Sequence, residues 1–249
     1  MHPDRLRIGT GGAAGSVNLQ PMASRDNTAA DAAYWYVPLS RALPAAIVAG
    51  MITFNPDHSP QLGFAAFGIF AALSGLATGF LSQRALPKGV ERTVFTVHGV
   101  ISLVAAIVAL AAPNAGLGFF LFLVSGWAIL TGFLELYAGF RSRGRNASSR
   151  DWLFVGALTV VFAIIILIIP PDLRQEFSGA EEGVSGVLSS SVIAVGLLGA
   201  YGAIIAVYLV IGALSLKWSA PGTPAATPAG KSAVTETPAT PGPQDGNAS

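Results

Sequence analysis

The chain has 249 residues, of which 52% are hydrophobic and only 11% are charged. Soluble domains carry about 25% charged residues, so this composition favours a protein whose solvent is lipid. The sequence contains no cysteine, which excludes disulfides, thiolate metal sites and thiol catalysis. The three histidines, His2, His58 and His98, are too far apart in sequence to suggest a metal site. We therefore expect an all-α integral membrane protein without a cofactor.

The two ends of the chain differ in composition from its middle. Residues 1–35 are rich in Gly, Ala, Asn and Asp and lack an apolar period, which predicts a disordered segment. Met22 precedes a hydrophilic stretch typical of a protein start, so residues 1–21 are a candidate for a wrongly assigned extension. Residues 219–249 are rich in Pro, Ala and Thr and predict a second disordered tail. The membrane domain is expected at residues 36–218.

Six stretches of this domain are long and apolar enough to cross a bilayer core of about 30 Å, which needs roughly 20 residues per helix. The uncharged run from Thr93 to Leu134 is too long for one helix, and Pro113 to Gly116 divides it, because proline and glycine end helices. The expected helices are Val37–Phe54, Leu62–Ser82, Thr93–Ala112, Leu117–Phe140, Trp152–Ile169 and Ser191–Leu216.

The basic residues predict the orientation of these helices. Only Arg174 falls on the side that holds the first, third and fifth connections. The other basic residues all fall on the opposite side: Arg5, Arg7, Arg25, Arg41, Arg84, Lys88, Arg92, Arg141, Arg143, Arg145, Arg150, Lys217 and Lys231. Because basic residues concentrate on the cytoplasmic side of membrane proteins, we expect both termini in the cytoplasm.

An internal repeat is visible in the spacing. Pro56, Pro113 and Pro170 are each 57 residues apart and each end an outward-going helix. The same shift carries Phe70 onto Trp127, Gly75 onto Gly132 and Arg84 onto Arg141, and a longer shift of 74 carries Trp127 onto Tyr201. The extra residues fall between Asp172 and Ser190. The pattern predicts three tandem helical hairpins, at about residues 37–83, 93–141 and 152–217.

A resemblance to a known family rests on this repeat. The stretch from Gly126 to Arg143, with its pattern WAI-x-x-G-x-x-E before a basic cluster, resembles the central repeat of the HdeD-like acid-resistance membrane proteins. Asp151-Trp152, Gly199 to Tyr201 and Val37 to Arg41 are also similar to that family, and the likeness covers about residues 36–218. It implies a six-helix inner-membrane protein that is tied to acid stress in some relatives. The family lacks a defined biochemical activity, and the third outer loop is longer here than its usual turn.

A polar layer is expected near the cytoplasmic ends of the helices. Glu135 lies six residues before Arg141 and His98 six residues after Arg92, so each is roughly 9 Å inside that end at about 1.5 Å per residue. Arg41 is the first-repeat equivalent of His98. One interpretation is a proton-sensitive pair or relay, because imidazole titrates near neutral pH. The alternative is a buried hydrogen-bonded pair that fixes helix register, or a side chain that reaches the headgroups.

Two further patterns carry weaker expectations. Ala71, Gly75, Gly79 and Gly132 form small-residue stripes that allow close helix contact, either within the monomer or between copies. In the third outer loop Leu173, Phe177, Val184 and Leu188 recur at helical spacing. That spacing is consistent with a short amphipathic segment at the membrane surface, with an ordinary solvated loop as the alternative.

These expectations lead to a non-enzymatic membrane protein with a role in acid or general stress tolerance. The sequence shows no nucleophile–base pair, metal cluster or phosphate loop. The alternatives are a small transporter or channel gated by the polar layer, and a scaffold that binds a membrane partner or a second copy of itself. The basic clusters lack the interleaved aromatic residues that nucleic-acid binding would favour, so the lipid bilayer is the partner we expect.

Overall fold

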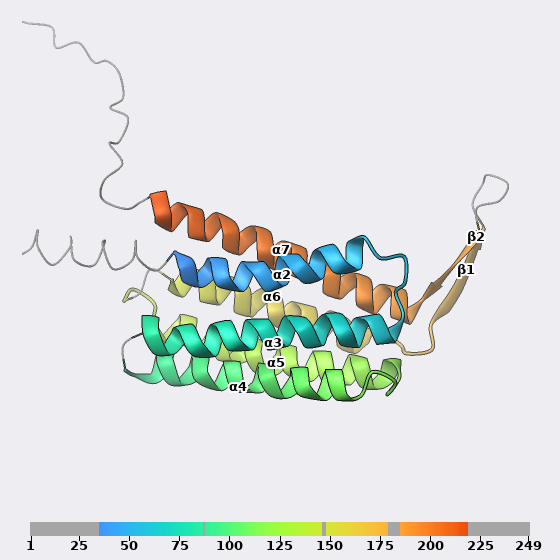
Figure 1. Ribbon diagram of the computed structural model, residues 1–249, viewed down its shortest axis with the longest axis horizontal. Helices are drawn as coiled ribbons and strands as arrows, with labels where there is room; N and C mark the ends of the chain where they lie inside the picture. Colours follow the sequence, from blue (N-terminus) through green and yellow to red (C-terminus); the bar gives the residue numbers. More distant parts are fainter. Residues whose placement is uncertain (1–34, 87, 146–147, 179–184, 219–249) are drawn as a thin grey trace, which may run out of the picture.

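The computed structural model describes residues 35–86, 88–145, 148–178 and 185–218, and these residues form six long helices and one β-hairpin (Figure 1). The predicted disordered segments at the two ends lie outside these ranges, apart from Trp35. The helices are α2 (Tyr36–Thr53), α3 (Pro60–Ala85), α4 (Val90–Ala111), α5 (Leu117–Arg141), α6 (Ser149–Ile168) and α7 (Ser190–Trp218). The hairpin strands are β1 (Arg174–Ser178) and β2 (Ser185–Ser189).

All six helices are long and apolar enough to cross a membrane, which confirms the predicted fold class. Large apolar side chains point outward on every helix, and Ile107, Phe122 and Ile168 are each about 70% exposed. Water would make such a surface an aggregation hazard, whereas lipid solvates it. The bilayer requirement of about 20 apolar residues per span explains why the helix bounds lie close to those predicted from the sequence.

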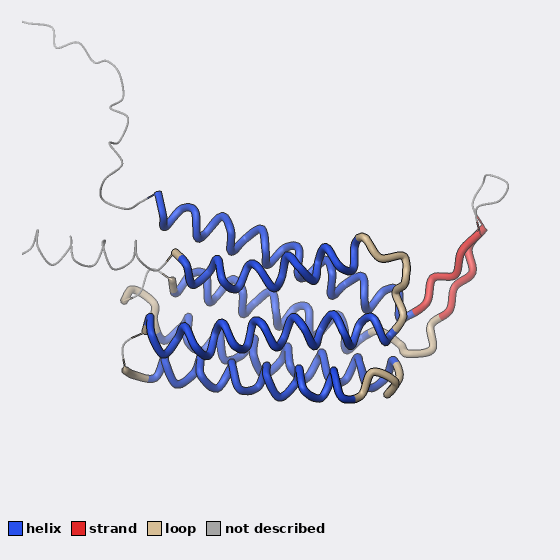
Figure 2. The backbone as a smooth tube through the Cα atoms, viewed as in Figure 1, coloured by secondary structure: helices blue, strands red, loops and turns tan. Residues whose placement is uncertain are grey.

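The helices lie side by side along the long axis of the molecule, as Figure 2 shows. At one end α2 begins, α7 finishes, and the α3–α4 and α5–α6 connections turn. This end carries Arg84, Arg92, Arg141 and Lys217, and we call it the basic end. The α2–α3 and α4–α5 connections and the β-hairpin lie at the opposite end, which we call the hairpin end (Figure 1).

Local signals explain where the hairpin-end turns stop and the helices start. The Ser59 side chain accepts a hydrogen bond from the backbone N–H of Leu62 at 3.3 Å, and Pro60 occupies the first helical position of α3. Serine is a favoured N-cap and proline lacks the N–H that would be unsatisfied there. Gly116 precedes α5 with φ +85°, a left-handed conformation that glycine adopts without a Cβ clash.

The third outer loop corrects one expectation. The spacing of Leu173, Phe177, Val184 and Leu188 left a solvated loop and a short amphipathic helical segment as the two interpretations, but β1 pairs antiparallel with β2 from Arg174↔Ser189 to Ser178↔Ser185. Val184 itself lies outside the described residues. The hairpin projects beyond the helical bundle (Figure 1). The Ser190 hydroxyl at the start of α7 donates to the carbonyl of Pro170 and accepts from the N–H of Leu173, which ties the hairpin base to the bundle.

The closest helix contacts run between neighbouring repeats. A Cβ atom built on Gly75 of α3 would lie 2.9 Å from the carbonyl oxygen of Gly99 in α4, and one on Gly132 of α5 would lie 3.1 Å from that of Gly156 in α6. Gly132 and Gly156 lie 57 residues after Gly75 and Gly99, so the same contact recurs in the next repeat. In the same way, a Cβ atom built on Gly202 of α7 would lie 2.9 Å from the carbonyl oxygen of Ala45 in α2. The tight pairs are therefore α3/α4, α5/α6 and α7/α2.

Candidate functional site

The second helix of each repeat faces the centre of the bundle. Phe70 of α3, Trp127 of α5 and Tyr201 of α7 occupy equivalent repeat positions and meet there. The Phe70 ring centroid lies 5.7 Å from that of Trp127 and 6.2 Å from that of Tyr201, both edge to face. This geometry is favourable for aromatic rings. We call these three residues the aromatic trio; they close the middle of the bundle.

A hydrogen bond accompanies each member of the trio that has a polar atom. Trp127 Nε1 donates to Ser102 Oγ at 3.0 Å, and the Tyr201 hydroxyl lies 2.8 Å from Thr159 Oγ1. Ser102 and Thr159 are also 57 residues apart. In the first repeat Phe70 has no polar atom, and the residue equivalent to Ser102 is Ala45. The polar partner is thus present in the two repeats that need one, which supports the repeat at the level of side-chain contacts.

The polar layer lies next to the trio, on the side of the basic end. Arg41 of α2 forms an ion pair with Glu135 of α5, in which the guanidinium donates to Oε1. His98 Nδ1 of α4 lies 3.7 Å from the same oxygen, beyond hydrogen-bond distance. Glu135 is 1% exposed and His98 5%. A buried carboxylate is costly unless it is paired, so Arg41 is the residue that allows Glu135 to lie there as an anion.

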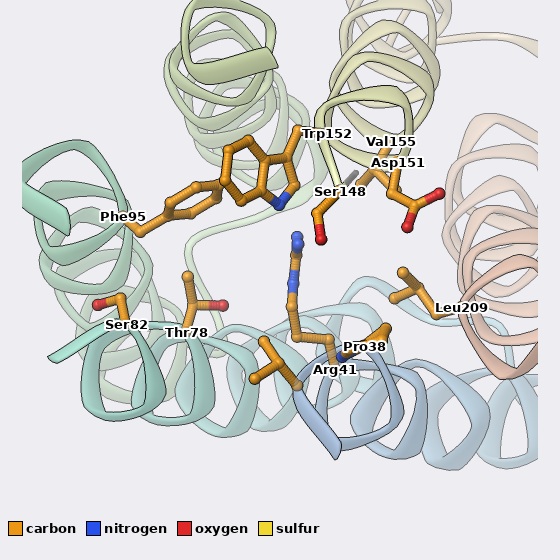
Figure 3. A pocket seen from close by; sticks show the side chains of 11 residues that line it. Pro38, Arg41, Thr78, Ser82, Phe95, Ser148, Asp151, Trp152, Val155 and Leu209 are labelled. Carbon is orange, nitrogen blue, oxygen red and sulfur yellow. The ribbon is translucent and has the colours of Figure 1, made fainter. Parts of the chain in front are cut away.

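Two small cavities flank Arg41. The vestibule, of about 30 Å³, lies toward the basic end and is lined by Arg41, Thr78, Asp151 and Trp152 among others. The inner cavity, of about 20 Å³, lies between Arg41 and the aromatic trio and is lined by His98, Glu135 and Tyr201 among others. In Figure 3 the Arg41 guanidinium rises from α2 into the centre of the vestibule, facing Ser148 and Trp152. Arg41 therefore separates the two cavities.

Asp151 carries a second, half-buried polar contact at the basic end. Figure 3 shows its carboxylate turned sideways from Arg41, and Oδ1 accepts a hydrogen bond from the Tyr208 hydroxyl at 2.9 Å. This bond joins α6 to α7. The vestibule thus contains one cation, whose ion-pair partner lies deeper in the bundle, and one carboxylate that is hydrogen-bonded at its wall.

Residues 97–168 match the family model described as short repeat of unknown function (DUF308). The matched segment runs from α4 through α5 to α6, and it contains His98, Ser102, Trp127 and Glu135. Arg41 and α7 lie outside it. No curated protein and no solved structure matches the chain.

The structure brings together the three side chains predicted for the polar layer, with Arg41 and not His98 as the direct partner of Glu135. The predicted small residues also lie at helix contacts within the monomer. Ala71 is fully buried, Gly75 and Gly79 face Gly99, and Gly132 faces α6. None of these contacts tests whether the residues have a function beyond packing.

Several polar residues of the site were not predicted from the sequence. Ser102, Thr159, Asp151 and Tyr208 look like ordinary small or interfacial residues of membrane helices. The repeat contained a usable signal for two of them, because the shift that aligns Phe70 with Trp127 also aligns Ser102 with Thr159. The Asp151–Tyr208 contact joins two helices whose side-chain directions no spacing rule in the sequence fixes.

Proposed function

We propose that this chain is a non-enzymatic bacterial inner-membrane protein that contributes to acid or general stress tolerance, as some HdeD-like proteins do. The observation that carries the proposal is the family match over residues 97–168. HdeD-like membrane proteins belong to that short-repeat family, and the matched segment contains the Gly126–Arg143 stretch on which the resemblance rests. The exposed apolar side chains of all six helices support a place within a bilayer.

The proposed orientation places the basic end in the cytoplasm. Support comes from the distribution of Lys and Arg: among the described residues they lie at or near that end, with the exception of Arg174 in β1. Positive residues next to membrane helices are retained on the cytoplasmic side. The β-hairpin then faces the periplasm, and Asp172 and Glu176 meet the external pH there.

Survival of a deletion strain across external pH tests the role. We expect fewer survivors than wild type after acid challenge, and normal survival at neutral pH. Expression of the intact chain should restore survival, whereas expression of an unrelated six-helix membrane protein should not. Equal survival of deletion and wild-type strains under acid and other envelope stresses would contradict the proposal.

A second candidate function is a small transporter or channel in which Arg41 is the gate. It is favoured by the position of Arg41, which lines both the vestibule and the inner cavity. Against it stands the apolar half of the bundle beyond the aromatic trio, which has no broken helix at the midplane of the kind that transporters use. Proton or ion flux into liposomes containing the purified protein decides the matter. Flux above that of empty liposomes, abolished by Glu135→Gln, would replace the first proposal.

A further inference from the structure

Four buried polar atoms around Arg41 lack a hydrogen-bond partner in the described part of the chain. They are Ser74 Oγ, Thr78 Oγ1, His98 Nδ1 and Glu135 Oε2. About 90% or more of buried polar atoms in proteins are hydrogen-bonded, to protein or to ordered water. Four unpaired atoms from three helices, all facing one small region, therefore indicate that something else binds there.

The size of the cavities limits what this ligand can be. A water molecule needs about 10–15 Å³ of such space, and the inner cavity and vestibule offer about 20 and 30 Å³. One or two waters fit, whereas an organic substrate does not. The inner cavity is lined by Ser74, His98 and Glu135, whose unpaired atoms would supply the two to four polar partners that a buried water requires.

Among the described residues, polar side chains reach this cavity from the basic end. The vestibule begins at the first turns of α2 and α6, where Pro38 and Trp152 line it. Toward the hairpin end the aromatic trio closes the bundle, and beyond it Phe64, Phe67 and Phe120 are fully buried. Apolar constrictions of this kind exclude water and ions. Access to the cavity is therefore one-sided.

The ionisable groups that face the cavity come from five helices. They are Arg41 of α2, His98 of α4, Glu135 of α5, Asp151 of α6 and Tyr201 of α7, while α3 contributes the hydroxyls of Ser74, Thr78 and Ser82. Tyr201 is bonded to Thr159, and Asp151 and Tyr208 are bonded to each other. Asp151 lines the vestibule alone, so the atoms of the inner cavity that are left free to accept a proton are Glu135 Oε2 and, in the tautomer with hydrogen at Nε2, His98 Nδ1.

We propose that the inner cavity is a proton-binding site at Glu135 Oε2, reached through water from the basic end alone. A hydronium ion in the vestibule gives a proton to the water of the inner cavity, and that water passes one of its own protons to Oε2. Each transfer breaks one O–H bond and forms another, and a neutral water is left in each cavity. Arg41 keeps its own proton, so the Arg41–Glu135 pair changes from neutral to singly positive. The neighbouring water accepts the hydrogen bond from the single O–H of the new carboxylic acid. The inference deepens the proposed acid-tolerance role, on which it rests for its purpose in the cell.

Infrared spectroscopy of the purified full-length protein in lipid nanodiscs tests the site. Acidification should produce the C=O stretch of a protonated carboxyl group that is shielded from bulk water. The band should disappear in Glu135→Gln and persist in the matched control Asp151→Asn, which removes the other carboxylate near Arg41. Labelling wild-type protein with [¹³C]glutamate should shift the band, which identifies a glutamate even where a variant folds poorly. A band that survives Glu135→Gln, or its absence from wild type, would overturn the proposal.

The natural lack of cysteine allows one-sided access to be tested with single serine-to-cysteine variants. Ser74→Cys should react with Ag⁺, a small thiol-reactive ion, when the ion is supplied at the basic end of oriented vesicles, and not when it is supplied at the hairpin end. Ser125→Cys is the control, because Ser125 of α5 is also buried but lines neither cavity; it should react from neither side. Reaction of Ser74→Cys from the hairpin end, or from neither end, would refute one-sided access. Both tests use purified protein or isolated vesicles and do not depend on cell survival. The proton site can therefore fail while the deletion strain is acid-sensitive, and the cellular role can fail while the proton site is present.

Discussion

Glu135 depends on Arg41, a residue far from it in sequence and on another helix. Removing one partner of a buried ion pair leaves an uncompensated charge, which typically costs about 3–5 kcal/mol, whereas replacing both partners with apolar residues is often nearly neutral. We expect Glu135→Leu or Arg41→Leu alone to destabilise the protein by about that amount, and the double variant to recover much of the loss. Thermal unfolding in detergent measures the double-mutant cycle.

The same cycle between His98 and Glu135 provides a comparison. Because His98 Nδ1 lies 3.7 Å from Glu135 Oε1, beyond a hydrogen bond, its coupling should be smaller than that of Arg41. An Arg41–Glu135 coupling within about 0.5 kcal/mol of zero, the usual error of additivity, would mean that the ion pair contributes nothing to stability. A larger coupling for His98 than for Arg41 would make His98 the main partner.

The hydrogen bond between Trp127 and Ser102 makes a second residue-level prediction. Trp127→Phe leaves the Ser102 hydroxyl buried without its donor, and an unsatisfied buried polar group costs about 1–3 kcal/mol. The double change Trp127→Phe with Ser102→Ala reproduces the Phe70 and Ala45 combination of the first repeat. It should therefore be more stable than Trp127→Phe alone. Equal or lower stability of the double variant, measured by thermal unfolding, would show that the bond is unimportant.

Sequence reasoning located the polar layer but not its pairing. Depth along a helix follows from residue counting, so Glu135 and His98 could be placed at the same level. Which side chains touch depends on the rotation of each helix about its axis, and that rotation is set by packing. The glycine contacts of α7 with α2 and of α5 with α6 fix it here, and they turn Arg41 toward Glu135.

At the scale of the helices, close packing depends on particular glycines. A Cβ on Gly132 would meet the Gly156 carbonyl at 3.1 Å and a Val160 methyl at 2.8 Å, whereas one on Gly126 of the same helix would meet nothing within 4 Å. We expect Gly132→Val to destabilise the α5/α6 pair by about 1–3 kcal/mol, the usual cost of overpacking, and Gly126→Val to be nearly neutral by comparison. Both are measured by detergent-induced unfolding. Similar losses in the two variants would refute a specific contact at Gly132.

The helices and the hairpin differ in how well the sequence predicts them. Spans are set by the thickness of the hydrocarbon core, so apolar length alone locates α2 to α7. The third outer loop offered only two pairs of apolar residues spaced four apart, Leu173 with Phe177 and Val184 with Leu188. Residues four apart share a face in a helix and also in a strand. That spacing therefore cannot distinguish a helix from a strand. The structure forms strands because the backbones of β1 and β2 pair with each other.

At the scale of the whole molecule, the charge asymmetry predicts topology. Reporter fusions at Asn146 and Ala220 should read cytoplasmic, and fusions at His58 and Gly179 should read periplasmic, because basic loops are retained inside. Fluorescent and alkaline phosphatase reporters give opposite signals on the two sides and serve as mutual controls. A periplasmic reading at Asn146 would reverse the proposed orientation.

The two ends of the chain outside the membrane domain make a separate prediction. Residues 1–21 and 220–249 lack apolar residues at a period that could dock onto the bundle, so their removal should leave insertion and thermal stability nearly unchanged. Yield of folded protein in detergent and the midpoint of thermal unfolding check this. A marked loss of folded protein after either truncation would show that the removed segment is structural.

The pairing of α2 with α7 has a consequence for synthesis. Among the six described helices, α2 is made first and has the lowest mean hydropathy, 1.3 against 1.9 to 2.5, and it carries the arginine of the polar layer. Its closest neighbour, α7, is made last, and the Lys217 ammonium lies 5.1 Å from the Trp35 ring just before α2. The nascent chain must therefore hold its least hydrophobic span in the bilayer until translation ends. In the finished protein α2 and α7 lie side by side, and the start of α2 meets the finish of α7 at the basic end. The six helices therefore form a closed ring that the chain enters and leaves at one point.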